Sequence, residues 1–190
     1  MQTARAFLLF SFFLIASTLT AVLSVENQDS TKAAALDFEK QVREYSLAYP
    51  GMLPDNPMYF IKATRDRIVE FLISDPLKKA QFHLLQTDKR IAAVSYLVPQ
   101  RKESKYVEEE LKLAEKYFLL TLEDLKRAKE QNIAVDDTTS RMRIAVRKYQ
   151  LILTDLQKQA KDEQTRTSLT NAVQKFVELE KNVAKVPPKQ

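Results

Sequence analysis

The chain contains a single glycine, Gly51, among its 190 residues. Average glycine usage of about 7% would supply roughly 13. Tight hairpin turns favour glycine, so a fold built from many short strands is improbable. Phosphate-binding loops and dinucleotide-binding fingerprints each need several glycines, which excludes both motifs. The scarcity of glycine therefore makes an all-β fold improbable, and the helical periodicity of the chain after residue 25 predicts an all-α fold.

Other missing residue types narrow the chemistry. The chain has no cysteine, no tryptophan and one histidine, His83. Without cysteine it cannot form disulfides, thiolate zinc sites, iron–sulfur clusters or a cysteine nucleophile. A Ser–His–Asp triad or a histidine-containing metal site would depend on His83 alone. We expect His83 to be a partly buried or surface residue, and we expect a non-enzymatic protein with no cofactor and no metal.

The first residues of the chain resemble a targeting segment. Residues 6–25 carry no charged side chain and follow Arg5, with an apolar core over residues 7–16. This is typical of a signal peptide, with cleavage after Ser24 or Ala21. A run of this length can also span a bilayer as a retained anchor. The remainder is exported in either case, because the positive end stays in the cytoplasm.

The following chain reads as one helical domain over residues 26–185, with a frayed tail at 186–190. Hydrophobic periodicity and end signals predict helices over about 32–49, 57–73, 76–98, 103–131 and from 136 onward. A polar stretch at 161–168 interrupts the last pattern. It allows one helix of roughly 48 residues or two helices joined by a hinge, and we favour the single helix.

Two helices carry apolar residues at coiled-coil-like seven-residue spacing. The first seam is Leu77, Leu84, Ile91 and Val98, and the second is Leu111, Phe118 and Leu125. We expect an antiparallel bundle built on this hairpin, with the last helix laid along it. The first helix or the distal part of the last would then be left to contact a partner.

Several residues have the character of helix caps. Asn56 precedes Pro57, and Asp75 precedes Pro76, so both are expected to cap helices that begin with proline. Asp136 and Asp137 are expected to cap the fifth helix. Asn132 is a suitable left-handed terminator for the fourth helix in a chain with almost no glycine.

Two motifs lie within residues 49–130. The first comprises Leu53, Pro54, Asp55, Pro57, Tyr59 and Lys62, and the second comprises Asp75, Pro76, Lys78, Lys79 and Ala80. Their spacing resembles an uncharacterised bacterial domain family of exported or membrane-tethered proteins, with Asn56 in place of the usual serine. The resemblance implies a helical fold and export, but no chemistry. Capping and turn formation explain these residues equally, and a partner site is the alternative.

The net charge of +5 is distributed without a strongly basic face, so we expect no nucleic-acid partner. Arg141, Arg143, Arg147 and Lys148 form a short basic cluster, expected to be a solvated face. The leading expectation is an interaction or structural domain at the cell envelope. It would bind a protein through amphipathic helix faces, or an envelope polymer, with membrane contact through residues 6–25.

The alternative is a small all-helical holdase chaperone. Residues 153–157 have the spacing Leu-Thr-x-x-Gln, which is similar to a signature of small periplasmic chaperones of the stress-response type. In that family the signature stands at helix starts, whereas here it falls within a predicted helix.

Overall fold

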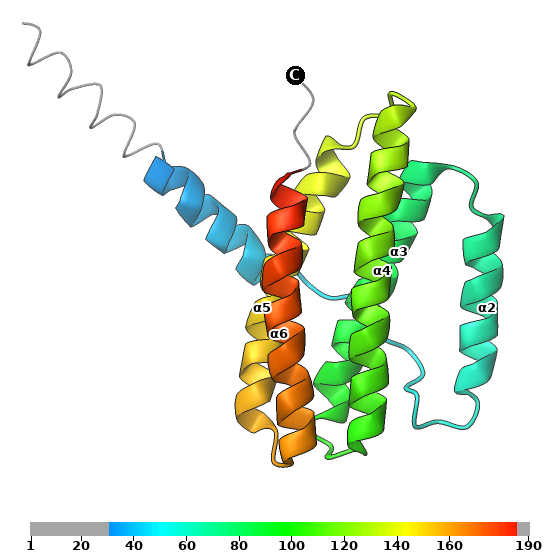
Figure 1. The fold of residues 1–190 in the computed structure, drawn as a ribbon, viewed down its shortest axis with the longest axis vertical. Helices are drawn as coiled ribbons and strands as arrows, with labels where there is room; N and C mark the ends of the chain where they lie inside the picture. Colours follow the sequence, from blue (N-terminus) through cyan, green and yellow to red (C-terminus); the bar gives the residue numbers. More distant parts are fainter. Residues whose placement is uncertain (1–30, 186–190) are drawn as a thin grey trace, which may run out of the picture. The chain divides into compact units, whose positions relative to one another are not determined.

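The computed structural model describes residues 31–185 (Figure 1). Within this range the chain forms helices and no strand, which confirms the all-α prediction. It divides into two units after Arg43, and residues 31–43 of the first unit are helical. The predicted signal or anchor segment and the tail lie outside the described range. None of the helices described is both long enough and apolar enough to cross a membrane.

Five helices make up most of the second unit. They are α2 (Tyr59–Leu72), α3 (Pro76–Leu97), α4 (Ser104–Glu130), α5 (Asp136–Gln159) and α6 (Glu163–Ala184). The helix α3 packs along α4, and α5 along α6, while contacts of α4 with α6 and of α3 with α5 join the two pairs. These four helices form the predicted bundle. The remaining helix, α2, packs closely on none of these four and lies beside α3 and α4 (Figure 1).

The centre of the bundle is an aromatic cluster contributed by three helices. Phe118 of α4, Tyr149 of α5 and Phe176 of α6 meet edge to face, with ring centroids 5.5–6.3 Å apart. All three side chains are buried. Edge-to-face aromatic pairs add to the stabilisation from burial alone, so this cluster fixes how α4, α5 and α6 pack.

The predicted seams form the core. Leu84, Ile91 and Val98 are buried on α3, as are Leu111, Phe118 and Leu125 on α4, whereas Leu77 is partly buried. The seven-residue spacing therefore identified the α3–α4 contact correctly.

The predicted caps were partly correct. The Asp75 carboxylate accepts a hydrogen bond from the Lys78 N–H at 2.8 Å and caps α3. Asn132 has a φ of 60° and terminates the region of α4, as predicted. Asn56 instead accepts from the Met58 N–H in a turn, and α2 begins two residues later than expected. Asp136 lies in the first turn of α5, where its charge complements the helix dipole, and Val135 is the N-cap.

The first predicted helix ends earlier than expected. Residues 31–44 are helical, but 45–50 are not. Here Tyr45 and Leu47 pack against the core of the second unit, and the Tyr45 hydroxyl reaches Asp88. These tertiary contacts outweigh the helical propensity of the local sequence.

The prediction of one long C-terminal helix was wrong, and the hinge alternative is correct. Ala160 is extended, and the Asp162 carboxylate accepts from the Thr165 N–H at 2.7 Å, which caps α6. The two helices then pack side by side, so the out-of-phase apolar residues of α6 enter the same core. We had expected the distal part of the last helix to be left free for a partner. Instead, this segment is α6 and it packs into the core. Residues 153–157 lie inside α5.

Candidate functional site

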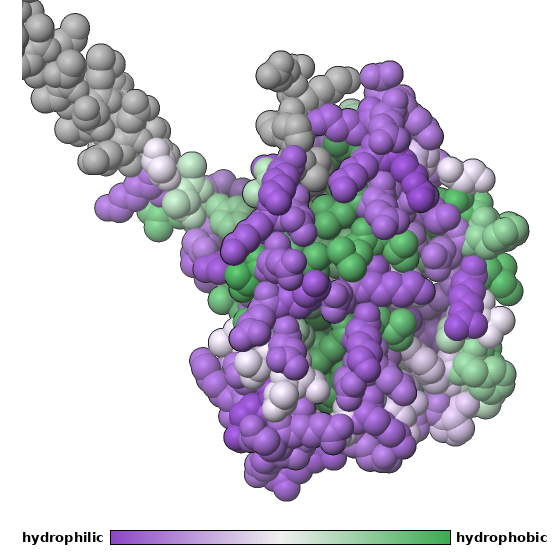
Figure 2. Space-filling view, in the orientation of Figure 1, coloured by the Kyte–Doolittle hydropathy of each residue, from purple (hydrophilic) through white to green (hydrophobic). Residues whose placement is uncertain are grey.

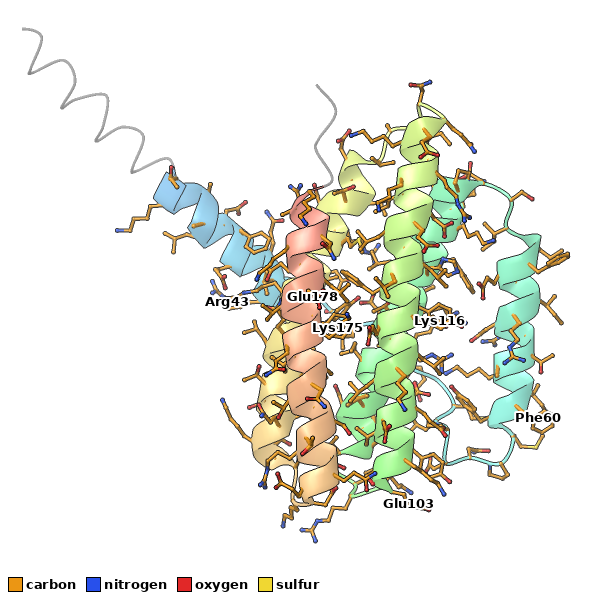
Figure 3. The ribbon with its side chains drawn as sticks, in the orientation of Figure 1. Arg43, Phe60, Glu103, Lys116, Lys175 and Glu178 are labelled. Atoms are coloured by element: carbon orange, nitrogen blue, oxygen red, sulfur yellow. The ribbon has the colours of Figure 1, made fainter. Side chains whose placement is uncertain are left out.

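The helix α2 is oriented with its polar side toward the bundle. On this side, Tyr59 contacts α4, Lys62 contacts the preceding loop and Glu70 contacts α3. The fourth polar residue of this side, Asp66, is buried. Its large apolar residues are exposed instead: Phe60, Ile61, Ile68, Val69, Phe71 and Leu72. Figure 2 shows hydrophobic surface over α2 at the edge of the molecule, and Phe60 is labelled in Figure 3. A surface helix of a globular protein normally has the opposite arrangement.

The centre of the inward side is an ion pair between two buried residues. Arg90 of α3 donates to Glu110 of α4, with Nη1 3.1 Å from Oε1. The Tyr59 hydroxyl donates to the same oxygen at 2.9 Å and also contacts the Arg90 guanidinium. Burial raises the pKa of Glu110, and Arg90 and Tyr59 partly offset that shift. Burial likewise raises the pKa of Tyr59, which stays a neutral donor.

His83 of α3 also contacts the inward side of α2. It is 1% exposed, which corrects the expectation of a partly buried or surface residue. Its Nδ1 lies 2.7 Å from Asp124 Oδ2 of α4, and its Nε2 lies 3.1 Å from Glu70 Oε1 of α2. Both ring nitrogens are therefore engaged by carboxylates. Neither is available to activate a nucleophile or to bind a metal in this arrangement.

We call this set of side chains the polar layer: Tyr59, Asp66, Glu70, His83, Arg90, Glu110 and Asp124. Its hydrogen bonding is incomplete, because Asp66 Oδ2 and Arg90 Nε have no hydrogen-bond partner within residues 31–185. Buried polar groups without partners cost free energy. The polar layer thus orients α2 while binding it less firmly than an apolar contact of the same size would.

Lys62 fastens the loop that precedes α2. Its ammonium donates to the carbonyl oxygens of Pro50 at 2.6 Å and Met52 at 3.1 Å, on either side of Gly51. Burial lowers the pKa of Lys62. Gly51 has a φ of 68°, a conformation that suits glycine. Lys62 therefore stabilises the turn that contains the single glycine of the chain.

The two motifs have different roles in the structure. Of the first, Leu53 packs against the core, Asp55 pairs with Lys102 at 2.9 Å, and Tyr59 and Lys62 hold α2. Pro54 is partly buried and Pro57 is exposed in the turn before α2. Of the second, Asp75 and Pro76 start α3, Ala80 is buried, and Lys78 and Lys79 lie in the first turn. Only the first motif reaches the polar layer.

Another buried carboxylate, that of Asp88, lies on the other side of α3. Asp88 accepts hydrogen bonds from the Tyr149 hydroxyl at 2.7 Å and from Tyr45 at 3.0 Å. Burial raises the pKa of Asp88 to about 6, and the two hydroxyls partly offset that shift. The Arg141 guanidinium lies 5.9 Å from the centre of the Tyr45 ring. Arg141 of the basic cluster therefore packs against an aromatic ring, in addition to facing solvent.

A groove of about 380 Å³ runs between α4 and α6, with Leu111 and Phe176 among its lining residues. Lys175 of α6, labelled in Figure 3, crosses toward α4 and lies 3.7 Å from Glu115 and 3.2 Å from Glu178. The charged residues that line the groove thus pair with one another, Lys175 with Glu115 and Lys112 with Glu108. Among the described residues, no cluster of three or more histidine, aspartate or glutamate side chains could hold a metal ion.

Comparison of the chain with family models, with curated proteins and with solved structures found no match in any of the three.

Proposed function

We propose that this chain is a non-enzymatic interaction domain that is exported and acts at the cell envelope, with the outer face of α2 as its binding surface. The observation that carries the proposal is the orientation of α2. Phe71 is 85% exposed, Leu72 70% and Phe60 63%, and all three stand on one short helix. Contiguous exposed apolar residues of this kind are characteristic of interaction sites.

The scale of the exposure supports a binding role. Full burial of a large apolar side chain stabilises by about 1.5–3 kcal/mol, and α2 leaves six such residues 39–85% exposed. The bundle does not use this free energy for its own folding. A partner that covers the face would gain a substantial part of it on binding.

The polar layer supports a structural role for the charged residues rather than a catalytic one. His83 is enclosed between two carboxylates, and Arg90 is paired with Glu110 inside the protein. Export rests on residues 6–25 and on the resemblance of both motifs to an exported bacterial family. The proposal requires no cofactor and no nucleic acid.

The test is photocrosslinking in the native cells. A benzophenone amino acid replaces Phe71 of the full chain, and the matched control replaces Leu151, a 45% exposed residue of α5. We expect adducts on the α2 peptide from the extracytoplasmic fraction and none at position 151, with mass spectrometry as the readout. Absence of adducts at position 71, or a chain retained in the cytoplasm, would contradict the proposal. Adducts with many unrelated unfolded proteins would favour the holdase alternative.

A further inference from the structure

We propose that the partner of α2 is a lipid surface: its outer face docks on an anionic bilayer, with the helix lying in the plane of the interface. This inference rests on the proposed function and names the chemistry of the partner. It follows from the order of residues around α2, from the charges at the edges of its apolar face and from the length of the helix.

The apolar residues form one continuous stripe. At about 100° per residue, Phe60, Phe71, Ile68, Ile61 and Leu72 fall in that order within an arc of about 120°. Thr64 is the one polar residue inside this arc. Its hydroxyl donates to the Phe60 carbonyl oxygen at 2.9 Å, so it already has a partner within the helix. The stripe can therefore leave water without stranding a polar group.

Arginines border the stripe on both sides. By the same geometry Arg67 lies about 20° beyond the Phe60 edge, and Arg65 about 20° beyond the Leu72 edge. Both residues are exposed, and Arg65 also contacts the Asp66 carboxylate at 2.8 Å. An apolar face flanked by basic residues is the pattern of helices that lie in a membrane interface. Arginine side chains there extend to the anionic headgroups while their stems cover apolar surface.

The charges of α2 also argue against a second copy of the chain as the occupant. Its acidic residues, Asp66 and Glu70, belong to the inward side. The charged residues beside the stripe are both arginines. A symmetric pairing of two α2 helices would bring four arginines together with no acidic residue of α2 between them, which opposes association. Anionic headgroups supply the complementary charge.

The dimensions of α2 fit docking along the surface. Its 14 residues span about 21 Å, less than the roughly 30 Å hydrocarbon core of a bilayer. The inward side keeps its contacts with Glu110 and His83 whether or not the outer face is covered. Docking thus requires no unfolding of the bundle.

The absence of tryptophan allows a direct test with the full chain. Phe71→Trp places one indole on the stripe, and Leu151→Trp places one on α5 as the control. Each variant is mixed with vesicles of phosphatidylcholine containing 30% phosphatidylglycerol, with or without brominated acyl chains. We expect a blue-shifted emission and at least twofold quenching by bromine for Phe71→Trp, and no change for Leu151→Trp. The comparison also separates docking of α2 from insertion of residues 6–25, which both variants share.

The arginines are tested in the Phe71→Trp background. Since a basic residue near an anionic surface is worth about 1 kcal/mol, Arg65→Gln with Arg67→Gln should weaken vesicle docking of the indole roughly 30-fold. The proposal would be overturned if the indole at position 71 is not quenched, or if quenching is equal at positions 71 and 151. It would also be overturned if docking is unchanged when both arginines are replaced. A protein adduct at position 71 in cells together with an unquenched indole would refute the lipid partner and leave the proposed function standing. Absence of both signals would refute both.

Discussion

Replacing Asp88 with asparagine should abolish one specific part of the pH dependence of folding. Asp88 is 1% exposed, and burial raises its pKa from 3.8 to about 6. Between these values the folded protein binds more protons at this site than the unfolded chain does. The free energy of unfolding therefore falls as the pH rises through this range. Asparagine does not titrate, so the variant lacks this loss.

The magnitude follows from the size of the shift. One pKa unit corresponds to about 1.4 kcal/mol, so the ionised Asp88 lowers stability by about 3 kcal/mol above pH 6. Roughly 2 kcal/mol of this develops between pH 4 and pH 8. Hydrogen bonds from Tyr149 and Tyr45 favour the ionised form of Asp88, and their effect on the pH dependence is already contained in the pKa of about 6.

The assay is urea unfolding of the wild type and Asp88→Asn at pH 4 and pH 8, followed by far-ultraviolet circular dichroism. We expect the variant to gain about 2 kcal/mol over the wild type on going from pH 4 to pH 8. Other titrating groups cancel in this comparison, because both proteins contain them. An unchanged difference between the two pH values would show that Asp88 does not titrate as its burial implies.

Three further substitutions test the parts that hold α2 and α6. Arg90→Met leaves Glu110 buried without its cation and should cost about 3–5 kcal/mol, whereas replacing both residues with apolar ones should cost less; a double-mutant cycle from urea unfolding decides this, and equal costs would contradict it. Asp162→Ala removes the cap of α6 and should cost about 1 kcal/mol in the same assay, with no loss meaning that the cap is dispensable. Gly51→Ala should cost about 1 kcal/mol through backbone strain alone, since no atom lies within 4 Å of the added methyl position, and a neutral result would show that the turn adjusts.

The bundle could be predicted from the sequence because the apolar spacing and the end signals of its helices are local patterns. The seven-residue seams of α3 and α4 predicted which faces meet, and Asp75 with Pro76 predicted where α3 starts. The single glycine argued against a fold built from many short strands. The break between α5 and α6 was misjudged because no proline or glycine marks it. The cap at Asp162 and the shift in apolar phase were its real signals.

The polar layer also has a periodic pattern in the sequence. Glu110, Tyr117 and Asp124 follow the same seven-residue spacing as the apolar seam of α4, each one position before a seam residue. On α3, His83 and Arg90 do the same. Charged residues on a helix are usually exposed to solvent, so this spacing alone does not predict burial. Their burial depends on whether another helix covers them, and that is a tertiary property that no local pattern determines.

The exposed stripe of α2 is therefore a consequence of α3 and α4 as much as of α2 itself. Turning α2 by half a rotation would place Phe60 and Phe71 against Arg90 and Glu110. The Tyr59 and Glu70 partners in the polar layer would then be lost, and the charges would face apolar groups. Hydrogen bonds and ion pairs are directional, so they select one orientation where apolar contacts would tolerate several. The polar layer therefore keeps the apolar stripe of α2 on the outside of the protein, where it is accessible to the proposed bilayer.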